Sequence, residues 1–253
     1  MDKKKRYFLE IAYRGTKYHG WQVQPKQVTV QKMVDHTLST VFNEPIHVQG
    51  CGRTDTGVHA SQFFLHFDAT KAIPDNFLYR SNKFLPKDIA IKRLISDVPA
   101  DAHARFDATY RAYHYFVHFQ KDPFLFDQSF FFPWRPLDFE TMQQAAKMLL
   151  DYNEFRMFCK SGHSSKTTLC NIFETQFTMD EANNRLVFKI AANRFLRGMV
   201  RRVMGCLLMM GKGKITMTEF KDVMDNQKPQ FENMNISVPP QGLFLSEVRY
   251  NYL

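Results

Sequence analysis

The sequence has no apolar run of the roughly 18–20 residues that a membrane-spanning helix needs. Its amino terminus is rich in lysine but passes at once into an alternating segment from Arg6 to Tyr13, which is not the pattern of a signal peptide. Cysteine is scarce, with four residues in 253 and no CxxC pair. Such sparse, unpaired cysteines are typical of reduced thiols, so we expect an intracellular, cytoplasmic protein.

A metal site is the one special role that this cysteine pattern leaves open. Cys159, His163 and Cys170 lie close together in the sequence. A fourth ligand at a spacing that suits tetrahedral zinc is missing, so the sequence predicts no metal.

Composition and net charge indicate a globular protein with a basic surface. The chain has 44% hydrophobic residues, which is enough for a globular core, and a net charge of +9. A basic surface can serve solubility alone, but its field also attracts polyanions, and phosphate contacts supply most of the nonspecific affinity for nucleic acids. Composition therefore leaves solubility and nucleic-acid binding both open.

Glycine is also sparse, yet three of the 11 glycines fall within the eight residues from Gly50 to Gly57. Such a cluster is unfavourable inside a helix or strand and suits a tight loop. The loop carries Arg53, Asp55 and His59, and we expect strands at Ile46–Val48 before it and Gln62–Phe67 after it. Binding and catalytic groups often lie on such loops, although an ordinary hairpin turn built on Asp and Gly fits the same composition.

The string GRTDTGVHA, from Gly52 to Ala60, resembles the catalytic loop of the TruA family of tRNA pseudouridine synthases, whose usual form is GRTDAGVHA. Thr56 stands where the family usually has alanine. Four other blocks resemble the family in the same order along the chain. In the first of them Arg14 replaces the usual aspartate, and outside the blocks an arginine that commonly follows a threonine is missing near Thr168. These blocks are the Trp21 loop (residues 13–25), Arg111–Tyr115, Asn193–Arg201 and Pro239–Leu245.

Hydrophobic periodicity predicts a mixed order of elements. Alternation indicates strands, an apolar stripe at helical spacing indicates helices, and Thr29 suits the N-cap of one of them. In the first half we expect strands at Arg6–Tyr13 and Ile89–Ile95 and helices at Thr29–Phe42 and Asp75–Phe84. In the second half we expect strands at Arg111–Val117, Asn171–Thr178 and Arg185–Ala191, and helices at Phe139–Leu150 and from about Phe195 to Met210.

The resemblance implies an α+β protein with the pseudouridine synthase fold, in which two similar α/β halves with antiparallel sheets meet around a central basic cleft. The halves are expected at residues 1–105, with the Asp55 loop, and 106–253, with the tyrosine strand and the arginine helix. The resemblance also implies a homodimer that isomerises uridine to pseudouridine in the anticodon stem-loop of tRNA, at tRNA positions 38, 39 and 40, without a metal or a cofactor.

The resemblance also assigns roles to single residues. Asp55 is the expected nucleophile, at either uracil C6 or ribose C1′. Tyr113 is expected to stack on the target base and is the candidate acceptor of the C5 proton, and Arg201 is expected to keep Asp55 charged. Arg53 is expected to fill the gap that a flipped base leaves, and Leu245 to wall the uracil pocket. The expected RNA contacts are Arg194, Arg197 and His59.

Less specific interpretations remain for these residues. A tyrosine on a strand is commonly a core residue, and Arg194, Arg197 and Arg201, which fall on one face of the expected helix, could form a solvated basic face. Two other classes of protein also fit parts of the pattern. One is a tRNA-binding protein of the same fold without catalysis, which needs no buried acid. The other is a glycoside hydrolase, which needs a second carboxylate that we do not find.

Overall fold

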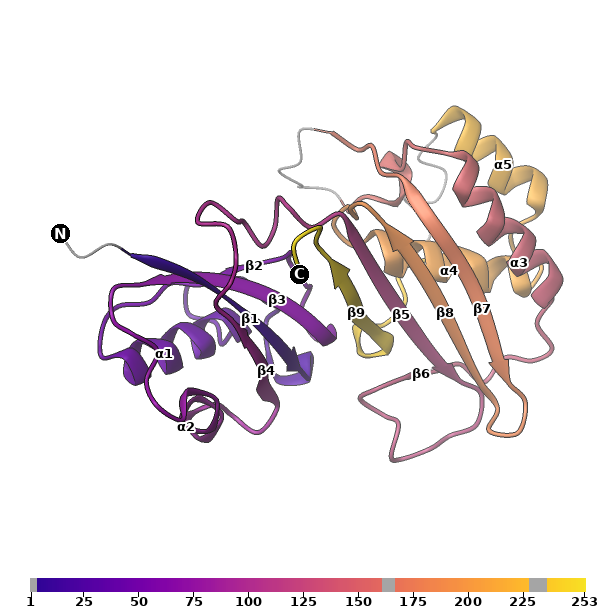
Figure 1. The fold of residues 1–253 in the computed structure, drawn as a ribbon. Helices are drawn as coiled ribbons and strands as arrows, with labels where there is room; N and C mark the ends of the chain where they lie inside the picture. The colour runs from indigo at the N-terminus through magenta and orange to yellow at the C-terminus, as the bar shows by residue number, and fades with distance from the viewer. Residues whose placement is uncertain (1–3, 161–166, 228–235) are drawn as a thin grey trace. The chain divides into compact units, whose positions relative to one another are not determined.

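The computed structural model describes residues 4–160, 167–227 and 236–253 (Figure 1). The chain divides into two compact units, each described below by itself. The first contains Met1–Arg111 together with Phe244–Leu253, and the second contains Ala112–Leu243. Residues 106–111 and the last ten residues, all expected in the second half, thus belong to the first unit. None of the described helices has the length and apolar character to cross a membrane.

The first unit is a sheet with two helices. Its strands follow the order β4-β1-β3-β9, with the short β2 paired to β3. Strand β3 is antiparallel to β1, whereas β9 runs parallel to β3, with Leu245 opposite Ala60. The strands are β1 (Lys5–Tyr13), β2 (Gln49–Gly50), β3 (His59–Ala69), β4 (Ile89–Ile95) and β9 (Leu243–Arg249), and the helices are α1 (Val30–Phe42) and α2 (Phe77–Phe84).

Helix α1 forms as its sequence predicts. The Thr29 side chain accepts a hydrogen bond from the Lys32 amide at the N-terminus, and Asn43 ends the helix in the left-handed region at φ 48°. The residues that face the core are Val30, Val34, Thr37, Leu38, Val41 and Phe42. The expected strands Arg6–Tyr13 and Ile89–Ile95 are also confirmed, and α2 begins two residues later than expected.

The strand expected at Ile46–Val48 is wrong, and the reason lies in α1. The Ser39 hydroxyl accepts the Ile46 amide at 2.9 Å, and the Asp35 carboxylate accepts the Val48 amide at 2.8 Å. Since helix side chains occupy these backbone donors, sheet pairing begins only at Gln49, where Gln49 and Gly50 pair with β3.

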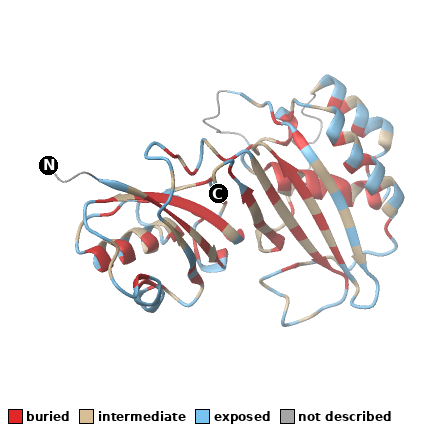
Figure 2. Ribbon diagram, viewed as in Figure 1, coloured by how far each residue is buried: buried red, intermediate tan, exposed pale blue. Residues whose placement is uncertain are grey.

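Aromatic rings cover both faces of the β1–β3 pair. On one face Phe67 contacts Tyr7 of β1 and Phe42 of α1. On the other face Phe8 contacts His66 and the C-terminal Tyr250. Both faces are therefore apolar core, which agrees with the nearly continuous burial of β3 (Figure 2).

The second unit packs three helices against a smaller sheet. Its strands follow the order β5-β8-β7, with the short β6 paired to β5, and Figure 1 shows the helices together on one side of these strands. Two helices were expected, and α5 was not, although its Thr216–Glu219 capping box is a recognisable start signal. The strands are β5 (Tyr110–His118), β6 (Phe130–Phe131), β7 (Ile172–Asp180) and β8 (Arg185–Ala192), and the helices are α3 (Phe139–Met148), α4 (Met199–Gly211) and α5 (Met217–Asn226).

Helix α4 is almost wholly buried but starts later than its sequence predicts. Gly198, at φ +70°, lies in the left-handed region directly before the first helical residue, Met199. Upstream, the Asn193 amide donates to Asn171 O and the Asn193 side chain accepts from the Asn171 amide, which keeps the chain at the end of the β7–β8 pair. The expectation that Arg194 and Arg197 lie on this helix is therefore wrong, and only Arg201 does.

Candidate active site

The Asp55 loop, residues 51–58, connects β2 to β3 in the first unit. Some of its side chains are buried in the core, and others are exposed to solvent. Cys51, Thr54 and Val58 are buried, whereas Arg53 is exposed and Asp55 is partly exposed. The loop thus presents an arginine and a carboxylate from a base that is fixed in the core.

A second segment, the supporting loop of residues 14–22, holds the Asp55 loop through its backbone. The Trp21 amide donates to Thr54 O at 3.2 Å, and the Gly57 amide donates to Tyr18 O at 3.3 Å. At the end of β1, the Tyr13 hydroxyl and the Thr54 hydroxyl form a buried hydrogen bond of 2.9 Å. These bonds fix the backbone on both sides of Asp55.

Two glycines allow the supporting loop to come this close. A Cβ atom at Gly15 would lie 1.9 Å from Val58 O, and one at Gly20 would lie 2.4 Å from Thr54 O. Gly20 also has a φ of +81°, a conformation that L side chains rarely adopt. The glycines of this segment are therefore required by contact with the Asp55 loop, and not only by a turn.

His59, the first residue of β3, belongs to the same anchor. Its Nδ1 accepts a hydrogen bond from the Gly15 amide at 3.0 Å, and its ring stacks on Phe244 with centroids 4.5 Å apart. The side chain is 0% exposed. The expectation that His59 contacts RNA directly does not agree with this burial, because the imidazole has no surface to present. Its contacts are those of a positioning residue.

Arg111 fastens the start of the Asp55 loop. Its Nη2 donates to Cys51 O at 3.0 Å and to Arg105 O at 2.6 Å, and its Nη1 donates to Ala108 O at 3.0 Å. Burial raises the pKa of the Cys51 thiol to about 11, so this cysteine stays protonated at neutral pH and serves as packing. One guanidinium thus joins the loop to the segment before β5.

In the second unit, Tyr113 and Arg201 are both held by neighbours. The partly exposed Tyr113 ring meets Phe195 edge to face, with centroids 5.2 Å apart. Arg201 Nε donates to Val238 O at 2.7 Å, and the buried Tyr115 hydroxyl donates to Pro239 O at 2.8 Å. Burial raises the pKa of Tyr115, and the nearby Arg201 charge opposes that rise.

The remaining predicted residues are distributed between the units. In the first unit, Leu245 is buried at 1% exposure and lies opposite Ala60 in the parallel pairing of β9 with β3. In the second, Arg197 is exposed and Arg194 is partly buried in the segment before α4. Asp55 and Arg53 thus belong to the first unit, and Tyr113, Arg194, Arg197 and Arg201 to the second.

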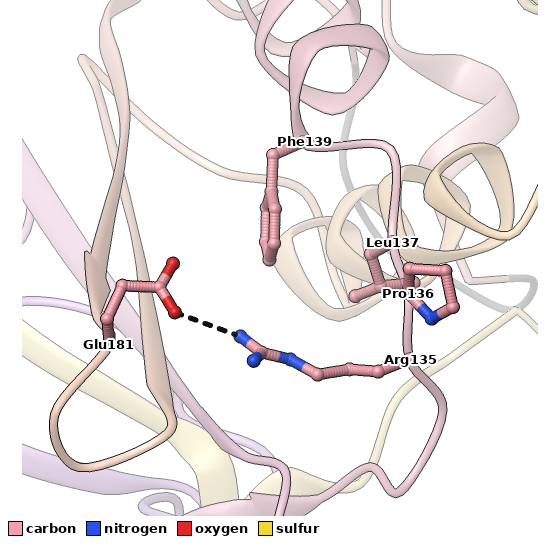
Figure 3. Close-up of a pocket in the computed structure, with 5 residues that line it drawn as sticks. All are labelled: Arg135, Pro136, Leu137, Phe139 and Glu181. Carbon is pink, nitrogen blue, oxygen red and sulfur yellow. Dashed lines mark ion pairs between the residues drawn. The ribbon is translucent and has the colours of Figure 1, made fainter.

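The structure contains a pocket that none of the predicted residues lines (Figure 3). Its volume is about 360 Å³, and it lies in the second unit before α3. Arg135 crosses it to Glu181, with 3.8 Å between Nη2 and Oε2, and the guanidinium also lies over the Phe119 ring. Its other lining residues are Pro136, Leu137 and Phe139.

Within residues 4–160, 167–227 and 236–253, no three His, Cys, Asp or Glu side chains gather as metal ligands do. Cys159 and Cys170 are free thiols, and His163 lies outside the described residues.

The sequence did not reveal which residues anchor the Asp55 loop. The Tyr13–Thr54 pair and the Arg111 contacts join residues that are 41 and 60 positions apart. No periodicity signals such contacts. Gly15 and Gly20 gave the available signal, because two glycines near an aromatic residue indicate close backbone approach as readily as they indicate a turn.

Comparison with known proteins agrees with the motifs. The family model described as tRNA pseudouridine synthase matches residues 11–107 and 145–251. A protein of Porphyromonas gingivalis named tRNA pseudouridine synthase A is 42% identical over 248 residues, which cover 97% of each chain. Proteins of the same name from Parabacteroides distasonis and Coxiella burnetii are 41% and 37% identical, over 97% of this chain and 96% and 93% of theirs.

The matched ranges contain the Asp55 loop, both of its anchoring glycines and the start of α4. The identity to the first of these relatives extends over almost the whole of both chains. The chain belongs to the tRNA pseudouridine synthase family.

Proposed function

We propose that this protein isomerises uridine to pseudouridine in tRNA, with Asp55 as the nucleophile. The observation that carries the proposal is the Asp55 loop, whose backbone is anchored on both sides while its carboxylate stays partly exposed. A catalytic carboxylate needs this combination, because it must reach the substrate and yet keep a fixed position.

The chemistry explains why one carboxylate suffices. The N1–C1′ bond of uridine breaks, the uracil turns, and a C5–C1′ bond forms while C5 releases its proton to water and the freed N1 takes up a proton. The product has the same atoms as the substrate, so the reaction consumes no co-reactant. Attack at uracil C6 and attack at ribose C1′ both use the same Asp55 carboxylate, and the proposal covers both.

The other roles follow the family resemblance and the placement of each side chain. Tyr113 stacks on the target uracil, and its ring is already oriented by Phe195. Arg201 supplies the positive charge that accompanies the nucleophile, and Val238 O orients its guanidinium. Arg53, exposed two residues before Asp55, fills the gap in the RNA, and Leu245 contacts the uracil.

The substrate is tRNA, modified at uridines of the anticodon stem-loop at tRNA positions 38, 39 and 40. The net charge of +9 supports binding of a polyanion, and the exposed Arg197 and the neighbouring Arg194 contact its phosphates. We further propose that the protein acts as a homodimer in the cytoplasm, as the resemblance implies.

Transcripts labelled with tritium at uridine C5 test this function, because only replacement of the C5 hydrogen releases the label. A tRNA with uridine at positions 38, 39 and 40 should release tritium with the wild-type protein. A matched transcript with cytidine at these three positions should release none. Equal release from both transcripts would contradict the site assignment, and binding without release from either would show a tRNA-binding protein that lacks catalysis.

A further inference from the structure

The turn from His103 to Phe106, in the first unit, presents an aromatic ring to solvent. Phe106 is 73% exposed, and the Arg105 guanidinium lies over its ring at 5.6 Å from the centroid. The His103 ring lies on the same phenylalanine, with centroids 4.2 Å apart. A single exposed apolar side chain needs no explanation by itself. What distinguishes Phe106 is the structure that holds it.

The turn is rigid because its backbone is bonded to its own side chains. His103 Nδ1 accepts from the amides of Arg105 at 3.1 Å and Phe106 at 3.3 Å. Asp107 Oδ2 accepts from the His103 amide at 2.6 Å and from the Tyr252 hydroxyl at 2.9 Å. The backbone that carries the exposed ring is thus held by hydrogen bonds on both sides of Phe106 along the chain.

Ala104, which lies between His103 and Arg105, forms hydrogen bonds with the core of the first unit. Its amide donates to His66 Nδ1 at 3.1 Å, and its carbonyl oxygen accepts from the buried Tyr250 hydroxyl at 2.6 Å. The turn is therefore part of the folded core at its base, while the Phe106 ring at its tip contributes little to apolar burial.

Two contacts connect this turn to the Asp55 loop. His103 Nε2 is 3.0 Å from the Gln49 side-chain oxygen, and Gln49 belongs to β2, which leads into the loop. The Nη2 atom of Arg111 donates to both Arg105 O and Cys51 O, so one nitrogen joins the turn to the first residue of the loop. The ring and the proposed nucleophile are consequently carried by one connected, rigid part of the first unit.

We propose that Phe106 is a stacking platform for an unpaired base of the bound tRNA, and that Arg105 contacts a phosphate beside that base. The inference rests on the proposed function, because it takes the tRNA of the same reaction as its ligand. An exposed aromatic ring with a cation at its face is what single-stranded RNA binds, since every base has a π face that can stack. Fixing the ring in advance removes most of the entropy cost of ordering it on binding.

Substitutions at Phe106 test the stacking directly. Phe106→Ala should weaken binding of a tRNA transcript about 5- to 150-fold, the range that loss of one stacked base produces. Phe106→Leu should lose as much, whereas Phe106→Trp should bind as the wild type does and its indole fluorescence should be quenched by tRNA. The value of kcat at saturating tRNA should stay unchanged in all three variants while KM rises for Ala and Leu.

A matched ligand and a matched variant complete the experiment. The Phe106→Ala defect should vanish when the ligand is a duplex RNA of similar length without unpaired bases. Phe124→Ala removes a ring that is 85% exposed but lies between Asp122 and Asp127, and it should leave tRNA affinity unchanged. Arg105→Gln should lower the slope of log Kd against log salt by about one unit, and Phe106→Ala should leave it unchanged.

Four outcomes would overturn the proposal. They are an unchanged tRNA affinity for Phe106→Ala, full rescue by Leu, equal losses for tRNA and duplex RNA, and a shift in oligomeric state by sedimentation at unchanged tRNA affinity. Unfolding by denaturant separates binding from folding, since removal of a ring this exposed should leave stability unchanged. A wild-type protein that binds tRNA but releases no tritium would refute the proposed function and leave the stacking measurements valid.

Discussion

Gly15→Ala is the substitution that most sharply tests how the Asp55 loop is held. The added methyl group would lie 1.9 Å from Val58 O and 2.7 Å from Val58 C, both of them backbone atoms. A side chain can rotate away from such a contact, but a backbone that is anchored on both sides cannot. The Asp55 loop and the supporting loop must therefore move apart.

The size of the displacement follows from the contact distance. Ordinary van der Waals contact begins at 3.4 Å, so the separation must grow by about 1.5 Å. Val58 N donates to Asp55 O at 3.1 Å, so the movement is transmitted to Asp55, the proposed nucleophile. A misplacement of about 1 Å can cost roughly 100-fold in rate, and strain from added volume typically costs about 1–3 kcal/mol of stability. We expect kcat to fall about 100-fold or more.

The assay is tritium release from C5-labelled tRNA at saturating concentration, together with chemical denaturation. Gly52→Ala is the matched control, because it adds the same methyl group within the Asp55 loop with nothing within 4 Å. It should leave both rate and stability near those of the wild type. Wild-type turnover by Gly15→Ala would refute the reasoning, and so would equal losses in the two variants.

Three further predictions test other parts of the account. Tyr13→Phe and Thr54→Val should each lower the free energy of unfolding by about 1–2 kcal/mol, because each leaves the other buried hydroxyl one hydrogen bond short. In denaturation experiments the double variant should lose clearly less stability than the sum of the two single losses. Strict additivity would mean that the two hydroxyls do not interact. Burial, aided by the nearby Arg6 and His103 charges, lowers the pKa of His66 to about 4. Between pH 6.5 and 4 the unfolded chain therefore takes up a proton at His66 that the folded protein does not. The free energy of unfolding should fall by up to about 3 kcal/mol as the pH drops across this range. His66→Asn, which keeps an acceptor for the Ala104 amide, should flatten that dependence in urea titrations, and an unaltered pH profile would assign it to other groups. Arg197→Ala should weaken tRNA binding and reduce its salt slope by about one unit, whereas an unchanged slope would remove Arg197 from the RNA footprint.

The elements that the sequence predicted correctly are those specified by nearby residues. Helix α1 has its apolar stripe and its Thr29 N-cap within one segment. Both boundaries of β4 were predicted correctly. The β7–β8 pair was predicted for the same reason, since its strands alternate on either side of a polar turn.

The predictions that failed depended on distant or conformational features. Side chains of α1 capture the amides of Ile46 and Val48, and the positive φ of Gly198 delays the start of α4. The parallel pairing of β9 with β3 joins Ala60 to Leu245, across most of the chain. Local alternation carries no information on such a partner.

In the candidate site, too, features set by nearby residues were predicted and contacts between distant residues were not. The resemblance identified Asp55 because the string around it is short and contiguous. It did not reveal that Gly15 and Arg111 hold the loop, because those contacts exist only after folding. His59 was expected to contact RNA, but its side chain is buried and accepts a hydrogen bond from the Gly15 amide.

The central claim is that Asp55 is the nucleophile of a pseudouridine synthase, and tritium release by wild type and Asp55→Asn side by side tests it most directly. The account predicts release by the wild type, none by Asp55→Asn, and nearly equal binding of tRNA by the two, because the substitution keeps the size of the side chain while removing its nucleophilic charge. Release by Asp55→Asn at the wild-type rate would contradict the claim.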